Sequence, residues 1–227
     1  MEKIEKLDYG LEIYQNPDLY TFTSDAVLLA KFAKIKRGQT IADFGTGSGI
    51  IALYLAKAGA EKVYAVEIQP EMAEMAKKSV EHNNLQDVVE VINDNIKHFD
   101  KQVDVVVSNP PYKKKCEYVN MSMSRAIARH EIEIDMEGLI KSVNKVLKFG
   151  GAFYVCYDAD RTAELIFKLK SNGLEPKEMF FTQSALEKPA SIVFVKAVKG
   201  GRLGIKVLPT LITNSSDGKY IENLKVN

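Results

Sequence analysis

The chain has 227 residues, of which 46% are hydrophobic and 27% are charged, as is typical of an ordinary globular protein with a sizeable core. Lysine and arginine (31) nearly equal aspartate and glutamate (30). This balance excludes a global basic field of the kind that attracts nucleic acid. Any contact with nucleic acid must therefore come from local patches.

The sequence gives no sign of a membrane segment or of a metal site. Residues 1–6 lack the apolar core of a signal peptide, and no stretch approaches the ~18 apolar residues that a membrane span requires. We therefore expect a cytoplasmic location without membrane contact. The two cysteines, Cys116 and Cys156, have no neighbour at metal-ligand spacing, so we expect reduced thiols and no metal.

Apolar runs alternate with helix-period segments from residue 40 onward, and upstream Ser24-Asp25 can cap a helix over 26–33. In chain order, the expected strands are 40–44, 62–67, 88–92, 103–108, 152–156, 177–181 and 192–196. The expected helices between them are 50–58, 70–83, 135–149 and 161–171, the third of which stops at Gly150-Gly151. This alternation predicts an α/β fold, a parallel sheet covered by helices on both faces.

We expect one domain over residues 1–227, with an N-terminal extension at 1–38 and a C-terminal tail at 197–227. The tail reads as loop and short strand and contains a clear turn at 214–218.

A glycine-rich turn follows the first strand. Gly45, Gly47 and Gly49 stand at alternate positions, which lets the backbone turn tightly and approach a ligand. Such a turn can also serve packing alone. Glu67 ends the second strand 18 residues after Gly49, close to the ~20-residue offset at which an acid meets a ribose hydroxyl. Strand, turn, helix and acid-ended strand thus predict a nucleotide-type cofactor site.

Two aspartates extend this predicted site. Asp94, just past the third strand, can accept a hydrogen bond from an adenine amine or only cap a turn. Asp43 can orient the glycine turn and meet an amino group of the cofactor. The spacing of Gly47 and Gly49 departs from the nicotinamide-dinucleotide fingerprint, which disfavours a dehydrogenase.

Asn109-Pro110-Pro111-Tyr112 follows the apolar strand at 103–108. An amide side chain and carbonyls next to prolines form fixed acceptors, because each proline lacks an N–H and fixes its own φ. The Tyr112 ring offers a stacking face, and base–aromatic stacking is worth about 1–3 kcal/mol. The segment therefore predicts a pocket for a nucleobase amine or a side-chain amide. The same sequence is also compatible with a proline-rich turn that only caps a strand.

Together these motifs resemble the S-adenosylmethionine-dependent methyltransferases that act on amino groups. The resemblance covers roughly residues 22–196 and implies a Rossmann-like, doubly wound, mostly parallel seven-stranded sheet with one antiparallel strand at its edge. It also implies S-adenosylmethionine as the cofactor. Asn109, Pro110 and Tyr112 match the catalytic motif of the class. Asn109 also inherits a cofactor contact, and Pro111 a substrate contact.

Within this class the chain is most similar to the small bacterial tRNA adenine-N6 methyltransferases that modify the adenosine next to the anticodon of a valine tRNA. The similarity rests on residues 22–29, on Ala128-Arg129-His130-Glu131, and on Gly201-Arg202 with Leu208-Pro209. It implies that Thr23 and Asp25 line the cofactor crevice, although both can equally serve to cap a helix. It implies tRNA as the partner and leaves the role of Arg129-His130-Glu131 and the oligomeric state open.

The mechanism expected from the motif needs no metal. Asn109 Oδ1 and the Pro110 carbonyl would accept the two N–H bonds of an adenine amine and aim its lone pair at the methyl group. Lys113, Lys114 and Lys115 follow Tyr112 directly, while Lys196, Lys199, Arg202 and Lys206 cluster near the last strand. These lysines and Arg202 would meet RNA phosphates, or they are only a solvated surface.

Three other functions fit parts of the sequence. The Asn-Pro-Pro-Tyr loop suits a protein glutamine amide, as in a release factor, but only about forty residues precede the glycine turn, too few for the usual N-terminal domain of that family. DNA adenine methylation normally needs a target-recognition domain, for which no segment is long enough. A cofactor-binding interaction module would not need acceptors aimed at an amine.

Overall fold

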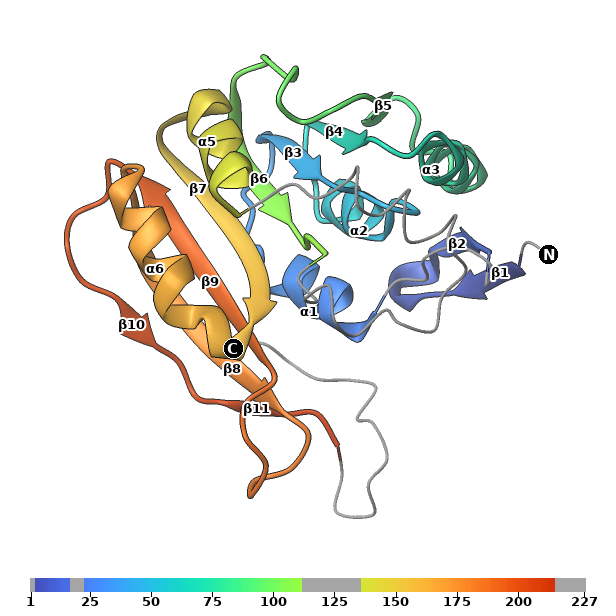
Figure 1. The fold of residues 1–227 in the computed structure, drawn as a ribbon. Helices are drawn as coiled ribbons and strands as arrows, with labels where there is room; N and C mark the ends of the chain where they lie inside the picture. The colour runs from blue at the N-terminus through green and yellow to red at the C-terminus, as the bar shows by residue number, and fades with distance from the viewer. Residues whose placement is uncertain (1–2, 17–22, 112–135, 215–227) are drawn as a thin grey trace, which may run out of the picture.

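The computed structural model describes residues 3–16, 23–111 and 136–214. A nine-stranded sheet forms its centre, with the order β10-β8-β9-β7-β6-β3-β4-β5 and with β11 paired to β8 (Figure 1). Its strands are β3 (Thr40–Phe44), β4 (Lys62–Glu67), β5 (Val89–Asn93), β6 (Val103–Ser108), β7 (Leu147–Asp158), β8 (Leu174–Gln183), β9 (Ile192–Lys199), β10 (Lys206–Val207) and β11 (Leu211–Ile212).

The middle of the sheet is parallel, from β7 through β6, β3 and β4 to β5. β9 lies between β7 and β8 and is antiparallel to both, so the fold predicted from the sequence is confirmed. The sheet has nine strands instead of seven because β10 and β11, in the expected tail, pair with β8.

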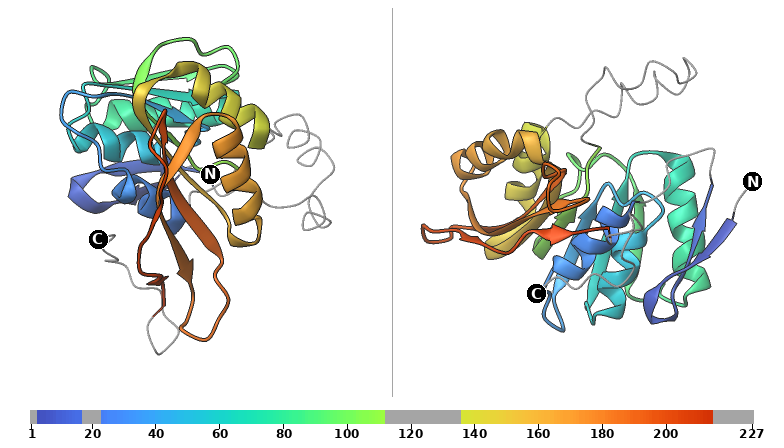
Figure 2. Two further views of the ribbon diagram at one scale, coloured as in Figure 1. Left: turned by 90° about the vertical axis from the view of Figure 1, so that its left-hand side faces the viewer. Right: turned by 90° about the horizontal axis from the view of Figure 1, so that it is seen from below.

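Helices cover both faces of the sheet (Figure 2). The helices are α1 (Ser24–Phe32), α2 (Ile50–Lys57), α3 (Pro70–His82), α5 (Met136–Val146) and α6 (Thr162–Ser171). One core cluster joins α1 and α2 to the sheet, and a second joins α5 and α6 to its other face. β6 is buried between the two: Val105 and Val107 pack in the first cluster, Val103 and Val106 in the second. Burial on both faces explains why this strand is a nearly continuous apolar run.

The helix expected over 135–149 was predicted too long, because it ends at Val146 and the chain enters β7 at once. Leu147 pairs with Val103, and the register then shifts before Val105 pairs with Ala152. A Cβ on Gly151 would lie 2.8 Å from the carbonyl oxygens of Asp104 and Lys148. This glycine therefore serves a close backbone approach inside a strand and does not end the helix.

The expected N-terminal extension contains a hairpin that the sequence did not reveal, formed by β1 (Lys3–Lys6) and β2 (Glu12–Gln15). The hairpin is fixed to α3 by two side chains. The Glu12 N–H donates to Asn83 Oδ1 and the Tyr14 N–H donates to Ser79 Oγ, both at 3.0 Å. At the other end of the chain, the tail expected from residue 197 begins inside β9.

Candidate functional site

The carboxyl ends of β3, β4, β5 and β6 meet at one edge of the sheet, where the open α/β fold usually places its ligands. Hydrogen bonds tie these ends together. The Gly45 N–H donates to Val66 O at 2.9 Å, and the Asp94 N–H donates to Glu67 O at 3.1 Å. Asp43, Glu67, Asp94 and Asn109, which lie far apart in the sequence, are therefore neighbours along this edge.

The glycine turn connects β3 to α2 in a backbone conformation that other residues rarely adopt. Gly45, Gly47 and Gly49 have φ values of 74°, 59° and 93°, and Gly49 is the N-cap of α2. A Cβ on Gly49 would lie 3.4 Å from the Ala76 Cβ. The glycines thus permit both the left-handed turn and the close approach of α3.

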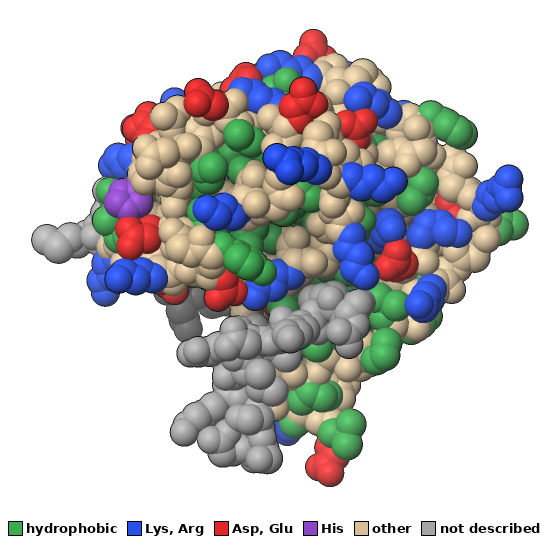
Figure 3. Space-filling model, turned by 180° about the vertical axis from the view of Figure 1, so that it is seen from behind, with side chains coloured by type: hydrophobic (Ala, Val, Ile, Leu, Met, Phe, Trp, Pro, Cys, Tyr) green, Lys and Arg blue, Asp and Glu red, His purple; other side chains and the backbone are tan. Residues whose placement is uncertain are grey.

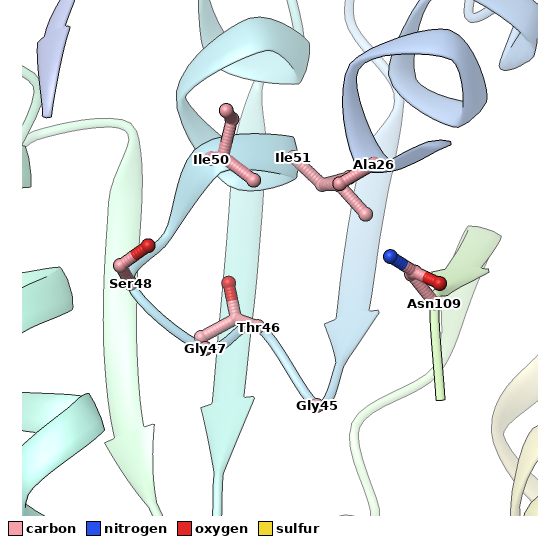
Figure 4. Close-up of a pocket in the computed structure, with 8 residues that line it drawn as sticks. All are labelled: Ala26, Gly45, Thr46, Gly47, Ser48, Ile50, Ile51 and Asn109. Carbon is pink, nitrogen blue, oxygen red and sulfur yellow. The ribbon is translucent and has the colours of Figure 1, made fainter. Parts of the chain in front are cut away.

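A pocket opens between this turn and the first turn of α1 (Figure 4). Asn109 from the end of β6 forms one wall, and Ala26 of α1 lies beside it. The other residues that line the pocket are Gly45, Thr46, Gly47, Ser48, Ile50 and Ile51. The structure thus brings the glycine turn and the Asn-Pro-Pro segment to one pocket.

Asp43 lies beneath the glycine turn and is fully buried. The Thr46 hydroxyl donates to Asp43 Oδ2 at 2.6 Å, whereas Oδ1 makes no hydrogen bond to the described residues. Burial, with a smaller contribution from the charge of Glu67, raises the pKa of Asp43 to about 7, against the lowering effects of the Thr46 hydroxyl and the Ala52 backbone. The turn is therefore anchored on a carboxyl group that keeps a proton up to near-neutral pH.

Glu67 holds the same turn from β4. Its Oε2 accepts the Gly47 N–H and its Oε1 accepts the Gln69 N–H, both at 2.9 Å. The side chain is only 5% exposed, and burial raises the pKa of Glu67. These two backbone hydrogen bonds hold the carboxylate against the turn.

Asp94 follows β5 and is more exposed than the other two acids. Its Oδ1 accepts the Asn95 N–H at 2.6 Å and lies 2.8 Å from His98 Nδ1. The hydrogen bond with His98 lowers the pKa of Asp94, so this carboxylate stays ionised. The structure thus shows the turn-capping contact that the sequence allowed, and it places Asp94 beside Glu67 at the carboxyl ends of the strands.

Thr23 and Asp25 flank the start of α1, next to the pocket residue Ala26. Thr23 has the N-cap position, but its hydroxyl makes no capping bond, and Oγ1 is buried without a hydrogen bond to the described residues. Asp25 lies close enough to Cys156 to contribute to the raised pKa of that thiol, after the larger effect of burial. Thr23 and Asp25 therefore lie close in the chain to Ala26, but neither is among the residues that line the pocket, and their role in the cofactor crevice stays a prediction.

The Asn-Pro-Pro segment leaves β6 at Asn109, with Pro110 buried and Pro111 exposed. The Ser108 hydroxyl donates to Phe44 O at 2.8 Å, which fixes the end of β6 to β3. Asn109 Oδ1 accepts the thiol hydrogen of Cys156 from β7, with 3.0 Å between sulfur and oxygen. Sequence analysis missed Cys156 at the site, because only the register between β6 and β7 places it there.

The remaining predicted residues do not join this pocket in the described part of the chain. Tyr112, Lys113, Lys114 and Lys115 lie outside the described residues, as do Arg129, His130 and Glu131. β9 runs antiparallel to β7, with Ile192 opposite Asp158 and Val198 opposite Ala152. Arg202, which follows β9, therefore lies near the amino ends of the parallel strands, away from Asn109.

The lysines near β9 also have partners within the protein. Lys196 Nζ donates to Glu178 Oε1 at 2.7 Å, and Lys199 Nζ donates to the carbonyl of Leu147 at 2.9 Å and to that of Asn144. On the face shown in Figure 3, basic side chains are spread among acidic ones. The structure thus gives these residues local roles and does not bring them to the pocket.

The described ranges hold neither a candidate metal site nor a candidate membrane-spanning helix. No group of three or more His, Cys, Asp or Glu side chains there could hold a metal ion. None of the helices within residues 3–16, 23–111 and 136–214 has the length and apolar character needed to cross a bilayer.

The strand order, the antiparallel β9 and the glycine turn after β3 define the fold of class I methyltransferases. A predicted O-methyltransferase from Agrobacterium tumefaciens has a similar fold, with a TM-score of 0.68 at 23% identity. The match covers 86% of this chain and 91% of that chain.

The chain belongs to the Methyltransferase small domain family, whose model matches residues 22–168, and it is therefore an enzyme. A curated tRNA1(Val) (adenine(37)-N6)-methyltransferase of Phocaeicola vulgatus is 33% identical over 173 residues, which are 74% of this chain and 71% of the relative. A protein of the same name from Bacteroides thetaiotaomicron is 33% identical over 145 residues, 60% of this chain and 59% of the relative. The family predicted from the sequence is confirmed.

Proposed function

We propose that this methyltransferase transfers the methyl group of S-adenosylmethionine to the exocyclic N6 amine of an adenosine in tRNA, the one next to the anticodon of a valine tRNA. The names of the Phocaeicola and Bacteroides relatives support this substrate. The observation that carries the proposal is the pocket itself, in which Asn109 faces the glycine turn and the first turn of α1. An amide next to a nucleotide-type cofactor site is suited to a substrate amine.

The glycine turn of the pocket and the acids beside it along the edge of the sheet fit S-adenosylmethionine. The buried Asp43 Oδ1 makes no hydrogen bond to the described residues and can take a cationic amino group near the glycine turn. Glu67 would bind the ribose hydroxyls, and Asp94, whose N–H donates to Glu67 O, would bind the adenine amine. We propose that Gly45, Gly47 and Gly49 let the backbone approach the ligand. Thr23 and Asp25 would close the crevice from α1.

When bound, the cofactor supplies an electrophilic methyl group on a positively charged sulfur. Asn109 Oδ1 and the Pro110 carbonyl would accept the N–H bonds of the adenine amine. These acceptors aim the nitrogen lone pair at the methyl group and stabilise the positive charge that develops on nitrogen. The pyrrolidine ring fixes φ of Pro110 and the following Pro111 restricts its ψ, so the carbonyl of the buried Pro110 has a defined direction.

A base in a stacked anticodon loop has to leave the stack to reach such a pocket, at a cost of about a few kcal/mol. Stacking on Tyr112 would offset this cost, and Pro111 and the lysines at 113–115 would meet the substrate beside it. A role for Arg202 would need RNA that extends to the opposite edge of the sheet. Location in the cytoplasm and a single domain remain predictions.

The test is methylation of unmodified tRNA with radiolabelled S-adenosylmethionine, followed by digestion and identification of the labelled nucleoside. Asn109→Ala should reduce kcat by about 10²-fold or more, as expected when a group that binds developing charge is lost. Cofactor affinity should change little. Asn172→Ala is the matched control, because Asn172 is equally half-buried and its side chain binds Lys168 O and Glu137, outside the pocket.

Three outcomes would redirect the proposal. Label in a release-factor fraction but none in tRNA would identify the substrate as a glutamine amide. Label in DNA would favour DNA adenine methylation. Full turnover by Asn109→Ala would contradict the role of the amide, whatever the substrate. The interaction-module alternative is disfavoured because the chain belongs to a methyltransferase family.

A further inference from the structure

Cys156 contacts the amide that the proposed reaction uses. In the register of the parallel pair, Ser108 of β6 lies opposite Val155 of β7. The next residues along the two strands are Asn109 and Cys156, and these meet through the thiol hydrogen bond to Asn109 Oδ1 at 3.0 Å. The contact joins positions 47 residues apart and follows directly from strand pairing.

The surroundings of the thiol leave it few other partners. Cys156 is fully buried, belongs to the core cluster that α1 and α2 cover, and pairs with Phe194 of β9 on its other side. Burial raises the pKa of the Cys156 thiol well above its ordinary value, with a further contribution from Asp25. The sulfur therefore keeps its hydrogen over the range in which enzymes are assayed, and it acts as a hydrogen-bond donor.

A side-chain amide needs such a donor to have a defined orientation. The oxygen and nitrogen of asparagine are nearly equal in size, so shape alone does not decide which of them points to the pocket. In Figure 4 the Asn109 nitrogen lies on the side of Ala26 and the glycine turn, and the oxygen lies on the other side. The Cys156 thiol favours the orientation in which Asn109 Oδ1 faces the sulfur, because the amide nitrogen cannot accept the thiol hydrogen bond.

We propose that Cys156 is a positioning residue that holds the Asn109 amide with its nitrogen toward the cofactor pocket and its oxygen available to the substrate amine. The thiol uses one lone pair of Oδ1 and leaves the second for the amine. Without the thiol donor, the side-chain amide can rotate by half a turn. A part of the molecules then presents the amide nitrogen to the substrate amine, and because both groups are donors, no hydrogen bond forms. Because the readout in turnover rests on the proposed function, a second readout must be independent of it.

The alternative role of Cys156 is packing of the core, and three substitutions separate the two roles. Cys156→Ser keeps a donor but is less apolar, Cys156→Val keeps apolar bulk without a donor, and Cys156→Ala has neither. Positioning predicts that kcat is retained by the Ser variant and falls about three- to ten-fold in both the Val and the Ala variants, the factor to which an ordinary hydrogen bond corresponds. Packing predicts the reverse order for Ser and Val.

The experiment measures kcat and KM for tRNA and for S-adenosylmethionine, together with the melting temperature, for these variants. Val155→Ala is the matched control, because Val155 is the neighbouring buried residue of β7 and pairs with Ser108 instead of Asn109. It should lower the melting temperature and leave kcat unchanged well below that temperature. In an Asn109→Ala background, Cys156→Ala should have no further effect on kcat.

The independent readout is the Asn109 side-chain ¹H–¹⁵N pair, assigned by its loss in Asn109→Ala. In the Ala and Val variants of Cys156 this signal should shift or broaden as the amide reorients, while the Ser variant keeps it sharp. A sharp, unshifted signal in Cys156→Ala, or a kcat that follows the melting temperature across the three variants, would overturn the positioning role. If wild-type protein does not methylate tRNA, the proposed function fails and this signal still decides the role of Cys156.

Discussion

The buried carboxyl group of Asp43 should make the protein less stable as the pH rises toward neutrality. In the folded protein its pKa is about 7, whereas an ordinary aspartate releases its proton near 3.8. Between these values the folded state binds more protons than the unfolded state, so the free energy of unfolding falls as the pH rises. Above pH 7 both states are ionised, and this contribution becomes constant.

The size of the effect follows from the two pKa values. The difference between 3.8 and about 7, at 1.36 kcal/mol for each pH unit, corresponds to about 4 kcal/mol. Asp43→Asn removes this contribution and retains an oxygen for the Thr46 hydroxyl. The new amide NH₂ is buried and costs about 1–3 kcal/mol at every pH. The variant should thus be less stable than wild type near pH 4 and more stable, by about 1–3 kcal/mol, near pH 8.

Urea unfolding of both proteins at several pH values from 4 to 8 measures this difference without cofactor. Asp104→Asn is a control for which the expected pH dependence of stability has the opposite direction. Partial burial would raise the pKa of Asp104, but its hydrogen bonds from Lys148 and from the Thr40 N–H lower it. The Asp104 carboxylate therefore stabilises the fold at neutral pH, and this stabilisation is lost as the pH falls. A constant stability difference between Asp43→Asn and wild type over the whole range would refute the reasoning.

Two further substitutions test the glycine turn and the hairpin. Gly49→Ala places a Cβ at a φ of 93° and against Ala76. The free energy of unfolding should fall by about 1–2 kcal/mol, and the cofactor should bind more weakly. An unchanged melting temperature and unchanged cofactor affinity would contradict the strained turn. Ser79→Ala removes the acceptor of the Tyr14 N–H, so the Tyr14 amide should exchange its hydrogen faster than in wild type. If the amide is protected as well as in wild type, the Ser79 contact does not hold the hairpin.

The sequence predicted the parallel core well because burial on both faces leaves an unambiguous pattern. The expected strands at 40–44, 62–67 and 103–108 have the same bounds in the structure. The first hairpin was missed because β1 is fully exposed and its lysines and glutamate resemble a solvated segment. Gly150-Gly151 was misread because a glycine pair after a helix is usually a stop, and only the pairing with β6 shows the second glycine inside a strand.

The candidate site was predictable where chain order alone brings residues together. Parallel strands with successive crossovers place all their carboxyl ends at one edge, so Asp43, Glu67, Asp94 and Asn109, each at or just past the end of an expected strand, lie along that edge, while their roles toward a ligand stay predictions. Cys156 depends on the register of two strands that are separated by a long segment, and no local pattern encodes that register. Arg202 failed to reach the pocket because an antiparallel strand ends at the opposite edge.

The burial of two acids beneath one turn links stability to ligand binding at this site. Asp43 and Glu67 both have raised pKa values, each mainly because burial removes water from the carboxyl group. A ligand with a cationic group and hydroxyls restores the interactions that burial removed, so it should favour the ionised form of both acids. Binding should then release a proton from Asp43 near neutral pH and stabilise the folded protein. Ligand binding should therefore protect the turn further, beyond the hydrogen bonds by which Thr46 and Gly47 already join it to the two acids.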